Sequence, residues 1–164
     1  MSRVRLGAAL GLVGTAFLCV SFAQSQPGRG VTIQGKQPQA ATPEPIAETK
    51  LLMNGLAAAN LRGLGKLLRE KPTDAEAWAF ARGQSLIIAE TGNLLLMRPP
   101  RTAGQELWLG HAADLRDSAD KLARAVAAKD YPKARANLAS LANVCNRCHQ
   151  AFQVPNRVDP FTEE

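Results

Sequence analysis

Three residues near the carboxyl end of the chain form the pattern with the clearest chemical meaning. Cys145 and Cys148 flank Asn146-Arg147, and His149 follows directly, which gives a C-x-x-C-H motif. Positions i, i+3 and i+4 share one face of a helix, so both thiols can reach the two vinyl groups of one porphyrin. The histidine can then offer a ring nitrogen to the iron. The motif predicts one covalently attached haem c, held by two thioether bonds, with His149 as the proximal axial ligand.

Two other chemistries use the same residues. The available ligands for a structural zinc site are Cys145, Cys148, His149 and His111. Such a site needs four ligands, and the adjacent cysteine and histidine fit poorly on one zinc ion. A dithiol redox motif normally begins a helix within a βαβ unit, whereas this pair is predicted near the end of a helix. The sequence favours haem attachment and leaves both alternatives open.

Long helices must position this motif, because every long segment after Ala47 has helical patterning and the breaks are well marked. The first predicted helix runs from about Ala47 to Arg69 and stops before Pro72, and the second runs from Thr73 to about Met97 and stops before Pro99. The third runs from Thr102 to about Ala128. The fourth opens after Asp130, with Pro132 in its first turn, and reaches about Phe152. Thr73 and Thr102 each stand three residues before a Glu or Gln, which is the spacing of a capping box. Four long helices with short loops predict an all-α fold, an antiparallel four-helix bundle.

The third and fourth predicted helices each carry one stripe at helical spacing. The stripes comprise Trp108, His111, Ala112, Leu115, Ala119, Leu122 and Val126 on the third helix, and Leu138, Leu141, Cys145, Cys148 and Phe152 on the fourth. Both thiols should therefore face the core. Gly55, Gly63, Gly65 and Gly92 lie inside predicted helices, where each costs about 1 kcal/mol relative to alanine. They predict the close approach of a neighbouring helix or of a bulky cofactor.

The first residues have the composition of a secretory signal peptide. Basic residues precede an apolar run over 6–20, and the small residues Ser21 and Ala23 stand at the cleavage positions. We therefore predict a cleaved signal peptide over 1–23 and export to the periplasm, with an uncleaved anchor or a lipoprotein signal as alternatives. Cleavage removes Cys19, and the two remaining cysteines both belong to the motif.

The rest of the chain divides by composition. Residues 24–46 hold four prolines, three glycines, five glutamines and no aromatic residue, which predicts a disordered linker. The bundle domain is assigned to 47–154 and a C-terminal tail to 155–164. The formal net charge is +6, but the basic residues are spread over all four helices, which argues against nucleic-acid binding.

A four-helix bundle behind a signal peptide, with C-x-x-C-H in its last helix and Phe152 three residues after the histidine, resembles the cytochrome c-prime family. The resemblance covers about Ile46 to Phe152 and includes the low-spin members of the family. It implies a haem between the helices, bound and ligated by the motif. Many members carry a basic residue directly after the aromatic one, where this chain has Gln153.

The resemblance also places the distal side of the iron against the first helix. Met53 lies where the low-spin members carry their ligand, which implies a methionine-ligated haem that carries single electrons. The alternatives are Met53 as a packing residue, His111 as the ligand, and five-coordinate iron that binds nitric oxide or carbon monoxide. Met97, at the end of the second predicted helix, is a further ligand candidate, although its position favours a core residue at a helix end. A structural or assembly domain of a larger redox complex is a further alternative.

The expected partners follow from this reading of the motif. They are redox partner proteins and the cytochrome c maturation machinery. The basic residues either form an ordinary solvated surface, or some of them neutralise haem propionates or attract an acidic redox partner. The candidates for such a role are Arg62, Lys66 and Arg147. The family often forms antiparallel homodimers, although no exposed stripe identifies an interface here. No hydrolase or transferase machinery is apparent, so an enzyme is not expected.

Overall fold

The computed structural model describes residues 42–162, so the predicted signal peptide and most of the predicted linker lie outside the described residues. The elements are α1 (Thr49–Leu52), the π-helical η1 (Met53–Ala58), α2 (Ala59–Leu67), α3 (Ala75–Leu96), α4 (Gln105–Ala127) and α5 (Tyr131–Ala151). Because α1, η1 and α2 follow one another without a break, they form one helical segment. Between residues 42 and 162 the chain thus has four helical segments and no strand, which confirms the predicted all-α class.

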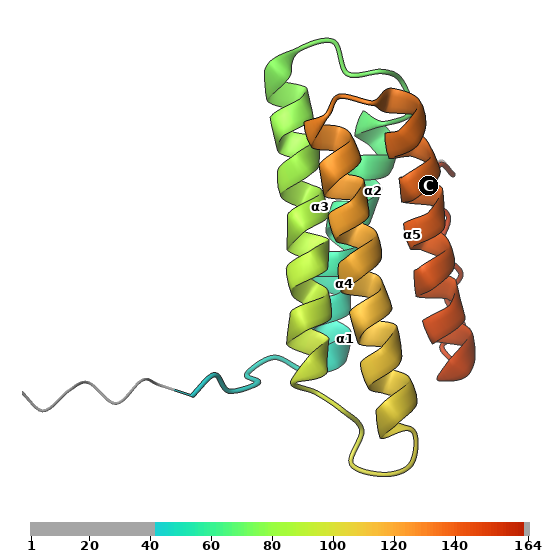
Figure 1. The fold of residues 1–164 in the computed structure, drawn as a ribbon. Coiled ribbons are helices and arrows are strands. Elements are labelled where there is room, and N and C mark those ends of the chain that lie inside the picture. The colour runs from blue at the N-terminus through green and yellow to red at the C-terminus, as the bar shows by residue number, and fades with distance from the viewer. Residues whose placement is uncertain (1–41, 163–164) are drawn as a thin grey trace, which may run out of the picture. The chain divides into compact units, whose positions relative to one another are not determined.

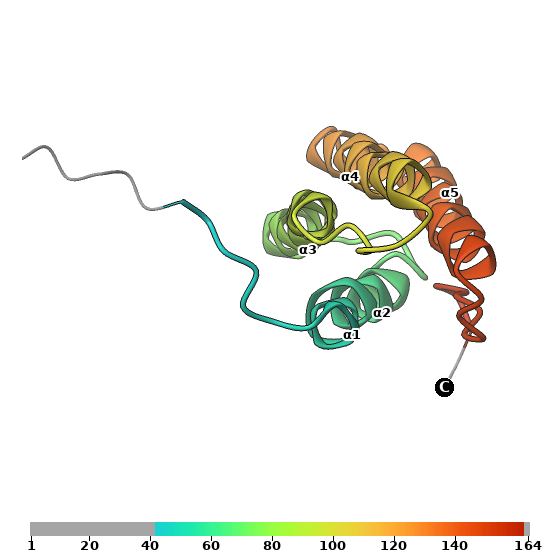
Figure 2. The ribbon, with the colours of Figure 1, turned by 90° about the horizontal axis from the view of Figure 1, so that it is seen from below.

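Successive helical segments run in opposite directions around one apolar core (Figures 1 and 2). The packing follows chain order, since α3 contacts both α2 and α4, and α4 contacts α5. The most deeply buried large side chains are mainly leucine and include Leu64, Leu68, Ile88, Leu122, Leu138 and Leu141. No helix in the described part of the chain is long and apolar enough to cross a membrane.

The residues that begin α3 and α4 differ from the predicted caps. Asp74, not Thr73, caps α3, and its carboxylate accepts a hydrogen bond from the N–H of Ala77 at 2.7 Å. A carboxylate also gains from the positive end of the helix dipole, so the aspartate is preferred to the neighbouring threonine. Before α4 the last residue is Gly104, not Thr102, with φ of 93° and no side-chain cap. The chain enters α4 through a left-handed turn that glycine tolerates best.

The start of α5 agrees with its prediction. Asp130 is the N-cap, and its carboxylate accepts a hydrogen bond from the N–H of Lys133 at 3.1 Å. Pro132 lies in the first turn, where its missing N–H would have no intrahelical partner. The helix then continues to Ala151, which carries the motif to the far end of the bundle.

The two predicted stripes face the core, and their burial decreases toward the end that carries the motif. The buried members are Ala112, Leu115, Ala119, Leu122, Val126, Leu138, Leu141 and Cys145, and the half-buried members are Trp108, His111, Cys148 and Phe152. All four half-buried residues lie in the first turns of α4 or at the last turns of α5 and its C-cap. The core is therefore less completely buried at this end of the bundle than at the other.

The helix glycines have different neighbours. A Cβ atom at Gly92 would lie 2.8 Å from the backbone oxygen of Ala112, so this glycine permits the close crossing of α3 and α4. At Gly65 a Cβ atom would overlap the carbonyl group of Pro160, which belongs to the C-terminal tail. Gly55 has no atom within 4 Å of its Cβ position. The predicted close approach of a helix is correct at Gly92, whereas at Gly65 the tail takes that place.

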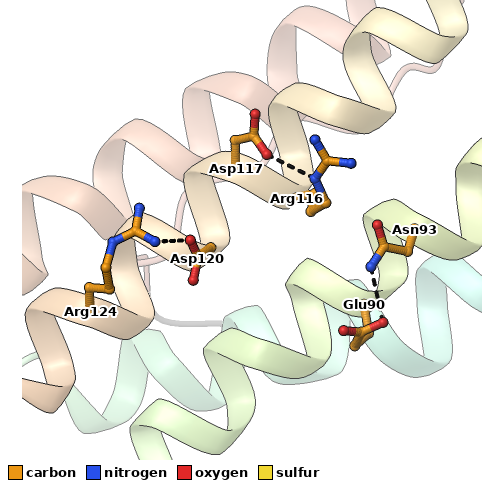
Figure 3. A network of polar contacts seen from close by, with 6 residues as sticks. All are labelled: Glu90, Asn93, Arg116, Asp117, Asp120 and Arg124. Carbon is orange, nitrogen blue, oxygen red and sulfur yellow. Dashed lines mark hydrogen bonds and ion pairs between the residues drawn. The ribbon is translucent and has the colours of Figure 1, made fainter.

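Polar pairs cover the outer faces of α3 and α4 (Figure 3). The pairs are Arg116 with Asp117, Arg124 with Asp120, and Asn93 with Glu90. The hydrogen bond from the Arg116 guanidinium lowers the pKa of Asp117. Water and salt screen exposed pairs of this kind, so they add little to the stability of the bundle.

Candidate haem attachment site

The two cysteines of the motif lie on the core side of the last turns of α5. Cys145 is 9% exposed and belongs to the apolar core, and Cys148 is half-buried one turn later. Both thiols are free. The structure therefore presents two unpaired thiols on one face of a helix, as the spacing predicts.

Burial sets the protonation of these thiols. It raises the pKa of Cys145 to about 11, with a smaller contribution from the neighbouring Cys148. Burial also raises the pKa of Cys148. Dithiol redox catalysts need a thiolate with a lowered pKa. The surroundings of this pair shift the pKa in the opposite direction, which counts against the dithiol alternative.

His149 has one ring nitrogen already engaged. Its Nδ1 lies 2.7 Å from the backbone oxygen of Asn156. A carbonyl oxygen can only accept, so the imidazole must donate its proton from Nδ1. In the neutral ring this tautomer leaves the lone pair on Nε2, which is the form that binds a metal ion.

The two residues between the cysteines are also held. The side chain of Asn146 makes two hydrogen bonds to the backbone of Val158, donating to its oxygen at 2.9 Å and accepting from its N–H at 2.8 Å. Arg147 faces outward and lies 3.6 Å from the carboxylate of Asp114 on α4, with both side chains 56% exposed. The motif is thus tied to the tail on one side and to α4 on the other.

Contacts among the helix ends bring four parts of the chain to this site. The indole of Trp108, in the first turn of α4, donates to the backbone oxygen of Leu95 near the end of α3 at 2.8 Å. Its ring meets Phe152 edge-on, with 5.2 Å between ring centres. Arg98 donates to the backbone oxygen of Ala47, just before α1, at 3.2 Å. The start of α1, the end of α3, the start of α4 and the end of α5 therefore share one end of the bundle (Figure 1).

Met53 lies at this same end. It is the first residue of the π-helical turn, is half-buried, and packs against the apolar core. π-helical turns are rare and occur frequently at functional sites. The wider turn coincides with the residue that the resemblance implies as the distal ligand, although sequence patterning alone gives no sign of it.

The other ligand candidates have different surroundings. His111 meets Phe152 edge-on at 6.2 Å between ring centres, and its buried Nδ1 has no hydrogen-bond partner among residues 42–162. Met97 is the half-buried C-cap of α3. Within the described range, no three or more His, Cys, Asp or Glu side chains are grouped to hold a metal ion, so the zinc ligand set is not assembled.

Asn146 and Asn156 have no role in the sequence-based prediction. The carbonyl group that meets His149 belongs to the backbone, and backbone acceptors have no signature in a sequence. A weak signal was Pro155, which favours a turn after the helix.

Comparisons with protein-family models, with curated proteins and with solved structures gave no match. The resemblance to the cytochrome c-prime family therefore depends on the motif and its placement in this chain.

Proposed function

We propose that this protein is a periplasmic monohaem c-type cytochrome that carries single electrons. Cys145 and Cys148 would hold one haem c through thioether bonds, with Nε2 of His149 as the proximal ligand and Met53 as the distal one. One observation carries the proposal. Two free thiols share the core face of α5 beside a histidine whose Nδ1 is engaged, which leaves Nε2 for iron.

Each residue has a distinct task in this proposal. When bound, the haem would supply an iron that cycles between the ferrous and ferric states. Cys145 and Cys148 would fix the cofactor irreversibly, and His149 would donate to its iron. A thioether from Met53 would favour the ferrous state, raise the reduction potential and leave no coordination position open.

Electron transfer also requires partners. The maturation machinery of the periplasm would attach the haem, and redox partner proteins would exchange the electron. Arg62 and Lys66 are exposed one turn apart on α2 and suit an acidic partner surface. Arg147 already has Asp114 as a partner, so it contributes less free positive charge.

An absorption spectrum tests the proposal. The full precursor is expressed together with the maturation machinery, and the protein is purified from the periplasm. Its mass is compared with the mass of the chain without the predicted signal peptide plus one haem. We expect covalent haem, low-spin bands, and the weak red band of methionine on ferric haem. Protein without covalent haem would overturn the proposal.

A matched pair of variants assigns the distal ligand. Met53→Ala should lose the red band, become high-spin and bind carbon monoxide when reduced, whereas Met97→Ala should keep the original spectrum. If the unchanged protein is already high-spin and binds carbon monoxide, the alternative of a nitric oxide or carbon monoxide binder replaces the electron carrier.

A further inference from the structure

Residues 153–162 form an ordered segment that we term the C-terminal strap. It begins where α5 ends and returns along α5 toward the start of that helix. The contacts that define this path pair Asn156 with His149, Val158 with Asn146, and Phe161 with Arg135. Each later residue of the strap thus meets an earlier residue of α5, so the two run antiparallel.

The reversal occurs in one turn. Gln153 has φ of 56°, the left-handed conformation that commonly ends a helix. The N–H of Val154 donates to the backbone oxygen of His149 at 2.8 Å, and that of Gln153 donates to Gln150 at 3.3 Å. These two bonds satisfy the last carbonyl groups of α5 and direct the chain back past the motif.

Apolar contacts hold the far part of the strap. Val158 and Phe161 are partly buried against the core, and the Arg135 guanidinium lies 4.4 Å from the centre of the Phe161 ring. The carbonyl group of Pro160 occupies the space that a side chain at Gly65 of α2 would fill. The strap therefore lies between α5 and α2 (Figure 2).

Polar contacts hold the near part against the motif itself. Asn146 stands between the two cysteines, and both polar atoms of its amide bond the backbone of Val158. Three residues further, Nδ1 of His149 donates to Asn156. The strap thus contacts the motif at the residue between the cysteines and at the histidine.

We propose that the C-terminal strap is a positioning element for His149, which fixes the tautomer and direction of the imidazole and thereby tunes the iron. A hydrogen bond from Nδ1 to a carbonyl group orients the ring and increases its electron donation through Nε2. Stronger donation favours ferric iron and lowers the reduction potential. The effect on iron rests on the proposed function, whereas the hold on the imidazole does not.

Three changes to the full precursor release the strap in different ways. Asn146→Ala removes both bonds to Val158. Gly65→Ala places a methyl group where the Pro160 carbonyl lies, and a stop codon after Val154 removes the strap beyond its first turn. The control variants are Asn143→Ala, an exposed asparagine on α5, and Gly83→Ala, whose Cβ position has no atom within 4 Å.

The first measurement is trypsin cleavage after Arg157, followed by mass spectrometry. In the unchanged protein and in both controls this bond should be cut slowly. In Asn146→Ala and Gly65→Ala we expect cleavage to be roughly tenfold faster. The strap of each variant can open locally without first breaking the contacts that the substitution has removed. Equal rates in all proteins would overturn the inference.

The second measurement follows His149 by its nitrogen chemical shifts in the reduced protein, together with the reduction potential. The unchanged protein should show an Nδ1 shift typical of an N–H that donates a hydrogen bond, and releasing the strap should move this shift and raise the potential. If haem is present but the truncation changes neither the shifts nor the potential, the inference fails and the proposed function stands. If no haem is attached, the proposed function fails, and the strap is judged by proteolysis and by the His149 tautomer of the haem-free protein.

Discussion

The two thiols of the motif differ in their surroundings before any cofactor is attached. Cys145 lies in the apolar core, whereas Cys148 is half-buried at the less closed end of the bundle. A reagent from the solvent therefore reaches Cys148 more readily than Cys145. The buried thiol, by contrast, couples its protonation to the folding of the whole chain.

Because of this coupling, we expect the stability of the haem-free protein to depend on pH. Burial raises the pKa of Cys145 from its ordinary value of 9.0 to about 11. Between these values the folded state keeps a proton that the unfolded state has lost, so stability is fully present below pH 9 and falls as the pH rises toward 11. A shift of this size corresponds to roughly 2–3 kcal/mol of unfolding free energy.

Urea unfolding between pH 8 and pH 11.5, in the presence of a reductant, measures this loss. Other side chains also respond to high pH, so the decisive quantity is the difference between the unchanged protein and Cys145→Ala. We expect the unfolding free energy of the unchanged protein to fall more steeply with pH than that of Cys145→Ala. If the two curves are parallel, the thiol of Cys145 is not the group responsible for the loss.

At the scale of the elements, the helix starts show how local chemistry decides a boundary. Thr73 and Asp74 both precede α3, and the capping-box spacing pointed to the threonine. The carboxylate of Asp74 holds the N–H of Ala77 instead. Two capping residues in succession compete for the same amide groups, and sequence spacing alone does not say which wins.

Paired alanine variants test this cap. Asp74→Ala should lower the unfolding free energy by about 1 kcal/mol, because it removes the bond to Ala77 and a favourable charge at the helix N-terminus. Thr73→Ala should change it by less than about 0.5 kcal/mol. Urea unfolding midpoints of the purified proteins compare the two, and a larger loss for Thr73→Ala would restore the threonine as the cap.

Some features of the helices could be predicted from the sequence and others could not. Pro72, Pro99 and Asp130 marked helix ends because their effects are local to the backbone. The core-facing placement of Cys145 followed from helical spacing alone. The π-helical turn at Met53 could not be predicted, since its residues have no pattern that distinguishes a wider turn from an ordinary one.

At the scale of the whole molecule, the strap was beyond sequence reasoning for a different reason. One of its contacts joins residues that are far apart in the chain, Pro160 and Gly65. The contacts of the strap with Asn146, His149 and Gly65 all use backbone atoms of the strap. Besides Pro155, the sequence contains one visible signal, the glycine Gly65 inside a helix, but a glycine does not identify its neighbour. The motif could thus be found from sequence, whereas the segment that holds its histidine required the fold.

Charge is the remaining property of the whole molecule that bears on its proposed function. Under the proposed function, the formal charge of +6 would fall by two when Arg3 and Arg5 were removed with the signal peptide, and the two propionates of the proposed haem would reduce it further. The pairs on α4 are internally balanced, so the excess positive charge lies elsewhere on the surface. A positive protein attracts anionic partners at long range, and salt screens this attraction.

Small oxidants of opposite charge test this property without a known partner. We expect ferricyanide, an anion, to oxidise the reduced protein more slowly as the ionic strength rises, and a cationic cobalt complex to react faster. The Debye length falls from about 30 Å at about 0.01 M salt to about 8 Å at about 0.15 M, so stopped-flow rates over this range should reveal both slopes. A neutral quinone is the control and should show no slope. If salt changes the rates of both charged oxidants in the same direction, electrostatic attraction does not govern their encounter with the protein. The proposal that the protein binds an acidic partner surface would then lose its support.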